Sequence, residues 1–199
     1  MKHLNSNILC AVAIRTTGPV PGKHKLLEIA IIPLTGDCKV SREHMLFNIL
    51  FKPDELDVRR AEYNLDNDLV LKCLANGFEY NDGAELFEKW LKKLELRFFK
   101  KITVLCHNWA FKRPFLVDWL QPAGFDLAFN EDYRDPQACG LFVNDRFDVR
   151  NEPYPFAKVR LSYMCATHKL EYASRLPTVI DECDACIKLY RSLIHTQNF

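Results

Sequence analysis

Two pairs of residues near the C-terminus have the types and the spacing that a zinc ion can use. Cys165 and His168 form a C-x2-H pair, and Cys183 and Cys186 form a C-x2-C pair. Structural zinc takes four such thiolate and imidazole ligands, usually from knuckle turns. Here Cys183 and Cys186 lie one turn apart in a segment with helical spacing, where cysteines usually face a hydrophobic core. We therefore expect core packing for Cys165, Cys183 and Cys186 and no metal site.

A histidine, an amide and several aromatic residues follow an apolar stretch in the middle of the chain. His107 and Asn108 end that stretch, and the aromatic residues that come next at near-helical spacing are Trp109, Phe111, Phe115 and Trp119. Such rings can stack on nucleic-acid bases, but packing in a core is their commoner role. We expect core packing here.

The charge of the chain is balanced. Lys and Arg number 27 against 26 Asp and Glu, so the formal net charge of +1 gives no global attraction to nucleic acid. Any anion site must be local. One basic run offers phosphate contacts, although a solvated helix face is its usual role; it comprises Lys92, Lys93, Arg97, Lys100 and Lys101.

The composition predicts one domain over residues 1–199, because 199 residues with 48% hydrophobic content can bury a full core. Most of the eight cysteines are scattered through apolar segments, which is typical of reduced thiols. No stretch reaches the roughly 18 apolar residues of a membrane span, and no cleavage pattern follows the N-terminus. We expect a soluble, cytoplasmic protein without a membrane partner.

Alternating apolar stretches and turn residues predict the elements that position these side chains. Apolar stretches at 7–17, 25–35 and 45–52 predict three strands in an antiparallel meander. A short helix is expected at 69–74, ended by Asn76-Gly77. The later elements expected are a helix capped by Asp82, a strand at 102–108, a helix at 111–120, a short strand at 126–129, a helix from Asp135-Pro136 to Val143, a polar loop at 144–158, a helix at 161–169 and a final helix at 178–195 capped by Thr178.

Four strings in this order resemble motifs of the DnaQ-like, DEDDh-type 3′–5′ exonucleases. AVAIRTTG with LLEIAIIPL is similar to the D-x-E-T-T-G strand and its returning strand, and HNWAFKRPFLVDWL is similar to the middle motif at a helix start. YRDPQACGLF and LPTVIDECDACIKLY resemble the later segments, including the H-x4-D-A helix. The resemblance covers nearly the whole chain. It implies the α/β ribonuclease H-like exonuclease fold, with a mixed central sheet (antiparallel meander plus parallel strand) flanked by helices.

The resemblance also implies what has been lost. In this family four carboxylates hold two divalent ions, and a histidine deprotonates the attacking water. Carried over by motif, the first two acids fall at Ala13 and Arg15, the third at Lys112, the histidine at Val179 and the last acid at Asp184. Only Asp184 keeps its chemistry, so the pocket would carry a charge of about +1 and repel divalent cations. We expect no catalytic residues and no cofactor, with Mg or Mn needed only if activity survives.

Two roles remain open for Arg15 and Lys112. They can pair with Asp184 and stand where the metal ions would have been, or they can bind a phosphate and hold a nucleic-acid end without cutting it. The second role would use the retained Thr-Thr-Gly turn, which family members place against the terminal nucleotide. The candidate nucleic-acid-binding set is Arg15, Thr16, Thr17, Gly18, His107, Asn108 and Lys112.

We therefore predict a non-catalytic pseudo-exonuclease that acts as a binding or regulatory protein. Its partner is either single-stranded nucleic acid or a protein, and homodimerisation is open. One alternative is an active metal-dependent 3′–5′ exonuclease with a rearranged site, which would recruit Glu28, Asp118, Asp135 or Asp181. The other is a structural subunit with an inert cleft, which makes its contacts through 54–80 or 144–158.

Overall fold

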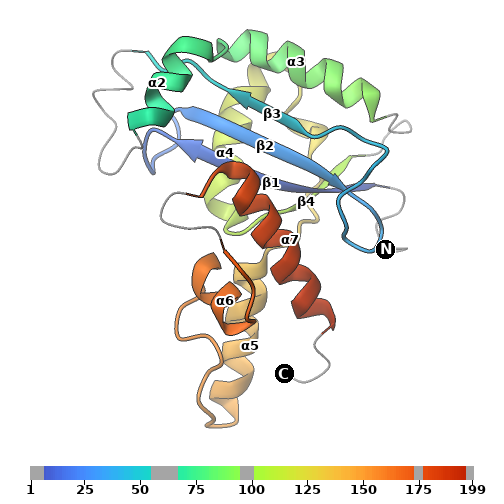
Figure 1. Cartoon of the computed structure of the whole chain (residues 1–199), viewed down its shortest axis with the longest axis vertical. Coiled ribbons are helices and arrows are strands. Elements are labelled where there is room, and N and C mark those ends of the chain that lie inside the picture. The colour runs from blue at the N-terminus through green and yellow to red at the C-terminus, as the bar shows by residue number, and fades with distance from the viewer. Residues whose placement is uncertain (1–6, 55–66, 95–100, 173–176, 196–199) are drawn as a thin grey trace.

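The sheet of this protein has four strands in the order β3-β2-β1-β4. The structure is a computed structural model that describes residues 7–54, 67–94, 101–172 and 177–195. Strands β1 (Ile8–Thr16), β2 (Leu26–Leu34) and β3 (Phe47–Leu50) pair antiparallel in succession, whereas β4 (Ile102–Leu105) pairs parallel with β1. The predicted meander with one parallel strand is confirmed (Figure 1).

Strand β1 is covered on both faces, which explains its nearly continuous apolar sequence. Side chains alternate along a strand, so Val12 and Ile14 point to one face and Ala11 and Ala13 to the other. Arg15 lies on the same side as Ala13, two residues nearer the end of the strand. Arg15, at the polar end of β1, therefore lies beside the element that covers the Ala13 face of the strand.

Helices α3 (Tyr80–Lys93) and α4 (Trp109–Leu120) cover the first face through an aromatic core. Phe87 and Trp119 lie 5.6 Å apart between ring centroids, in an edge-on arrangement that aromatic pairs favour. Trp109, Phe115 and Trp119 are buried, and Phe111 packs against the same core. The expected packing role of these aromatic residues is confirmed.

Helix α7 (Val179–His195) covers the opposite face of the sheet (Figure 1). Helices α5 (Pro136–Val149) and α6 (Leu161–Thr167) pack on α7 rather than on the sheet, around a separate apolar cluster. The other elements are α2 (Asn67–Asn76), η2 (Gln121–Ala123) and η3 (Asp126–Ala128). Among the described residues, no helix is both long and apolar enough to cross a membrane.

Several predicted boundaries need correction. Helix α3 begins at Tyr80 with Glu79 as its N-cap, so the predicted cap at Asp82 was wrong. The predicted strand at 126–129 is a 3-10 turn, after which Phe129 makes only an isolated bridge to Ile102. Helix α5 continues to Val149, so the loop predicted at 144–158 starts about six residues too early.

The cause of the longer α5 is its inward apolar side. Val143 is buried in the cluster beneath α5, and Phe147, one turn later, packs against the same cluster. A tertiary contact thus keeps a polar-looking segment helical. The predicted Thr178 cap of α7 is confirmed, because the Thr178 and Asp181 side chains each accept a hydrogen bond from the other's backbone N–H.

Candidate functional site

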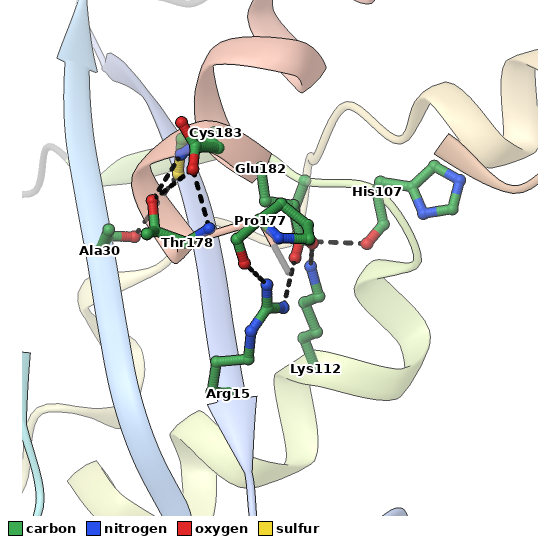
Figure 2. Close-up of polar contacts among 10 residues, drawn as sticks. Arg15, Ala30, His107, Lys112, Pro177, Thr178, Glu182 and Cys183 are labelled. Carbon is green, nitrogen blue, oxygen red and sulfur yellow. Dashed lines mark hydrogen bonds and ion pairs between the residues drawn. The ribbon is translucent and has the colours of Figure 1, made fainter. Parts of the chain in front are cut away.

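Three charged side chains from separate elements meet where β1 ends (Figure 2). Arg15 from β1 donates from Nη1 to Glu182 Oε2 at 3.0 Å. Lys112 from the first turn of α4 donates to the other carboxylate oxygen of Glu182, which belongs to α7. Arg15 also donates from Nη2 to the carbonyl of Pro177. Both oxygens of the only acid in this group are therefore engaged by cations.

The group is largely out of water, which makes its charges interdependent. The side chains of Lys112 and Glu182 are 8% and 13% exposed. Burial acts to raise the pKa of Glu182, but the charges of Lys112 and Arg15 outweigh it and hold that pKa below its ordinary value. Burial acts to lower the pKa of Lys112, yet Cys106 and Glu182 raise it. Both groups are ionised at neutral pH and depend on each other.

The prediction that Arg15 and Lys112 pair with Asp184 was wrong. Asp184 lies outside the group, with a side chain that is 52% exposed and an oxygen 2.6 Å from Lys188 Nζ. Two residues turn about 200° around an α-helix, so Glu182 and Asp184 point in nearly opposite directions. Because Cys183 and Cys186 face the core, Glu182 lies at the edge of the buried side of α7, and Asp184 faces solvent.

If Glu182 rather than Asp184 is matched to the last acid of the motif, the position matched to the histidine changes as well. Counted back from Glu182, the H-x4-D spacing falls at Pro177, which has no side chain able to take a proton. Val179, the position predicted from the sequence, is fully buried in the apolar cluster between α7 and the sheet. At either position the chain offers no general base.

The Thr-Thr-Gly turn at the end of β1 is held by hydrogen bonds of its own hydroxyl groups. Thr16 Oγ1 donates to the Gly18 carbonyl at 2.8 Å, and Thr17 Oγ1 accepts from the Lys25 N–H at 2.9 Å. His24 packs so closely that a Cβ on Gly18 would lie 2.4 Å from its imidazole ring. The turn requires glycine at this point because of that contact, and its hydroxyl groups are already used within the fold.

His107 and Asn108 connect β4 to α4 and hold the helix that carries Lys112. His107 Nε2 lies 2.8 Å from the Val159 carbonyl, and burial lowers the pKa of this imidazole. Asn108 adopts a left-handed conformation (φ 60°) just before α4. His107 is thus held by a backbone carbonyl and Asn108 forms the turn into α4, which fits a role of both residues in the fold.

Asp135, predicted from the sequence to open a helix or to serve as an alternative metal ligand, is the residue that fixes this junction. Its carboxylate accepts from the N–H groups of Asn108 at 3.0 Å and Trp109 at 2.9 Å, at the start of α4. It also caps α5 by accepting from the Gln137 N–H at 2.9 Å. One buried carboxylate therefore anchors two helix starts.

We expect Asp135→Ala to lower the free energy of unfolding by about 2–4 kcal/mol, because three N–H groups lose a charged acceptor. Urea denaturation followed by circular dichroism measures this loss. Asp132→Ala, a change at an exposed carboxylate three residues earlier, is the matched control and should shift stability by less than about 0.5 kcal/mol. Equal effects of the two changes would contradict the double-cap role.

The four residues with zinc spacing are not brought together. Cys183 Sγ is directed at the Ala30 carbonyl, 3.9 Å away, and Cys165 Sγ at the Ala185 carbonyl, 4.0 Å away. His168 Nδ1 lies 2.7 Å from Ser192 Oγ, and Cys186 is buried in the cluster between α7 and the sheet. Within the described part of the chain, no three His, Cys, Asp or Glu side chains are arranged to hold a metal ion.

Among the other acids considered for a rearranged site, Asp118 and Asp181 have partners of their own, and Glu28 is a strand neighbour of Arg15. Asp118 lies 3.4 Å from Lys25 Nζ, and Asp181 caps α7 through Thr178. Glu28 lies on β2 opposite Arg15, and burial raises its pKa. The donor set at the end of β1 thus does not fit two divalent ions, which need several free carboxylate oxygens.

The predicted basic run is only partly described. Lys92 lies 2.7 Å from Glu88 one turn earlier, in an exposed pair of the kind that decorates helix surfaces. Arg97 and Lys100 lie outside the described residues, as does the 55–66 part of the predicted 54–80 surface.

No protein-family model matches this chain, and neither does any curated protein sequence. Solved structures do match. The nuclease domain of 3′hExo, a DEDDh family member, bound to rAMP gives a TM-score of 0.66 at 13% identity, over 96% of this chain and 93% of that one. The structure of E. coli exonuclease I in complex with a dT13 oligonucleotide gives a TM-score of 0.69 at 13% identity, over 96% of this chain and 42% of that one.

A third match is cell-death related nuclease 4 (CRN-4), with a TM-score of 0.67 at 14% identity, over 96% of this chain. This chain spans 64% of the length of that nuclease. All three similarities extend over nearly the whole of the present chain at very low identity. The protein therefore has the α/β, ribonuclease H-like fold that DEDDh-type 3′–5′ exonucleases use.

Proposed function

We propose that this chain is a non-catalytic protein on an exonuclease-like fold, acting as a binding or regulatory protein. The observation that carries the proposal is the ion-paired group of Arg15, Lys112 and Glu182. The resemblance implies acids at the positions of Arg15 and Lys112, and the ion pairs of these two cations with both oxygens of Glu182 support the proposal. Electrostatics here oppose divalent-ion binding.

The chemical requirements of two-metal hydrolysis support this proposal. Two-metal hydrolysis requires ligands that hold both ions and a base that deprotonates water. Ala13 has no ligand atom, and Arg15 and Lys112 only donate hydrogen bonds. Pro177 and Val179, the two positions considered for the base, cannot accept a proton. An active enzyme would need both functions from residues that the fold directs elsewhere.

Binding of a nucleic-acid end is the second candidate, and the exposure of Arg15 favours it. The Arg15 side chain is 30% exposed, so its guanidinium can meet a phosphate at the rim of the group. Lys112 is nearly inaccessible, and the hydroxyl groups of the adjacent turn are used internally. Such binding would be weak and dependent on ionic strength.

The deciding experiment follows single-stranded DNA and RNA, labelled at the 5′ end, with Mg²⁺ or Mn²⁺. We expect no metal-dependent shortening by the wild-type protein. Metal-dependent shortening by the wild-type protein would overturn the non-catalytic proposal, and its persistence in Asp184→Asn would show that it does not require that acid. Titration of the same oligonucleotides at two salt concentrations tests the second candidate: salt-sensitive binding should be lost in Arg15→Gln and kept in Arg113→Gln, which changes an exposed arginine of α4.

A further inference from the structure

Helix α5 presents an apolar stripe to solvent on the side away from α7. Phe142 is 63% exposed and Val149 is 90% exposed, whereas Val143 is buried and Phe147 packs inward. Figure 1 shows α5 extending away from the sheet, at the opposite end of the molecule from α3. Large apolar side chains gathered on a projecting helix are typical of an interaction surface.

The stripe also contains two charged residues, and its pattern of residue types is complementary to itself. Phe142, Asp145, Arg146 and Val149 occupy positions i, i+3, i+4 and i+7, so all four lie on one face of α5. If an identical helix packs antiparallel across a two-fold axis between positions 145 and 146, Phe142 meets Val149 of the second copy, and Asp145 meets Arg146 of the second copy. Each contact occurs twice, and every one is favourable.

The shape of this surface also fits a second copy. Phe142, Asp145, Arg146, Val149 and Arg150 line a shallow hollow along α5. An apolar side chain from a facing helix can enter such a hollow, as in the knobs-into-holes packing of paired helices. Asp145 and Arg146 carry opposite charges at the centre of the stripe, which suits a self-complementary surface better than a strongly charged partner.

We propose that α5 forms an antiparallel homodimer interface, with a second copy of this chain as its partner. The proposal does not depend on the function of the Arg15–Lys112–Glu182 group, which belongs to a different part of the fold. Nuclease assays and dimer measurements therefore fail or succeed separately.

Charge reversal across the axis gives a specific test by sedimentation velocity, at protein concentrations up to about 200 µM. Asp145→Arg places like charges opposite each other in a homodimer, and so does Arg146→Asp. Each variant alone should dissociate with a dissociation constant raised about tenfold or more. An equimolar mixture of the two should recover association, because opposite charges then face each other in the mixed dimer.

Val149→Glu provides a second measurement, because this side chain is exposed in the monomer and its replacement should leave folding unchanged. We expect it to raise the dimer dissociation constant by about tenfold or more. Met45→Glu, at another exposed residue (77%), is the control and should leave association unchanged. A wild-type protein that stays monomeric, a dimer unaffected by Val149→Glu, or a mixture that does not recover association would each overturn the proposal.

Discussion

Glu182→Gln is expected to lower the free energy of unfolding by about 3–5 kcal/mol, which is the usual cost of removing one partner from a buried ion pair. The variant leaves the Lys112 ammonium, whose side chain is 8% exposed, with no anion in the group. Asp184→Asn should change stability by no more than about 1 kcal/mol, because its pair with Lys188 is exposed. Chemical denaturation of the two variants beside the wild type measures both changes.

The loss in Glu182→Gln should depend on pH in a defined direction. The folded-state pKa of Glu182 lies below its ordinary value of 4.5, so its ionisation contributes stability above about pH 4.5. This contribution is lost as the pH falls through the lower folded-state pKa, since a protonated Glu182 resembles glutamine. The difference between wild type and variant should therefore shrink under acid conditions.

A further substitution separates loss of the pair from general damage to α7. Lys112→Met removes the uncompensated charge while keeping a long side chain, and it should recover at least half of the stability lost in Glu182→Gln. If the double variant is as unstable as Glu182→Gln alone, the buried charge is not the cause. A large loss in Asp184→Asn would likewise contradict the assignment of Glu182 as the central acid.

The fold could be predicted because its signals are local. Nine-residue apolar strands separated by Gly and Pro turns specify β1 and β2, and the short apolar stretch before His107 specifies β4. Boundaries were less predictable where tertiary contacts decide them. Phe147 keeps α5 helical through a segment whose polar residues indicate a loop, and only the cluster beneath it shows why.

The site could be predicted only in part. Arg15 and Lys112 follow from strings anchored by a turn and a helix start, and both lie in the group. Glu182 was missed because matching a spacing of H-x4-D at low similarity allows a slip of two residues. The signal that could have found it is the spacing of Val179, Cys183 and Cys186, because these apolar positions fix the buried side of α7 and place Glu182 next to it.

Replacing both cations with acids should convert the group into a divalent-metal site. In Arg15→Glu with Lys112→Asp, three carboxylates would face one another, so their repulsion destabilises the metal-free protein and favours a cation. We expect Mn²⁺ to leave the melting temperature of the wild type unchanged. In the double variant, Mn²⁺ at about 100 times its dissociation constant should add about 2.7 kcal/mol, or roughly 5–10 °C.

Two additions to this double variant test which acid completes the site. Adding Glu182→Gln should abolish the Mn²⁺ effect, whereas adding Asp184→Asn should preserve it, because Asp184 faces solvent beside Lys188. If the double variant is unfolded without metal, recovery of its circular dichroism with Mn²⁺ serves as the readout. Absence of any Mn²⁺ effect, or its loss with Asp184→Asn alone, would show that the Arg15–Lys112–Glu182 group does not occupy the position of a metal centre.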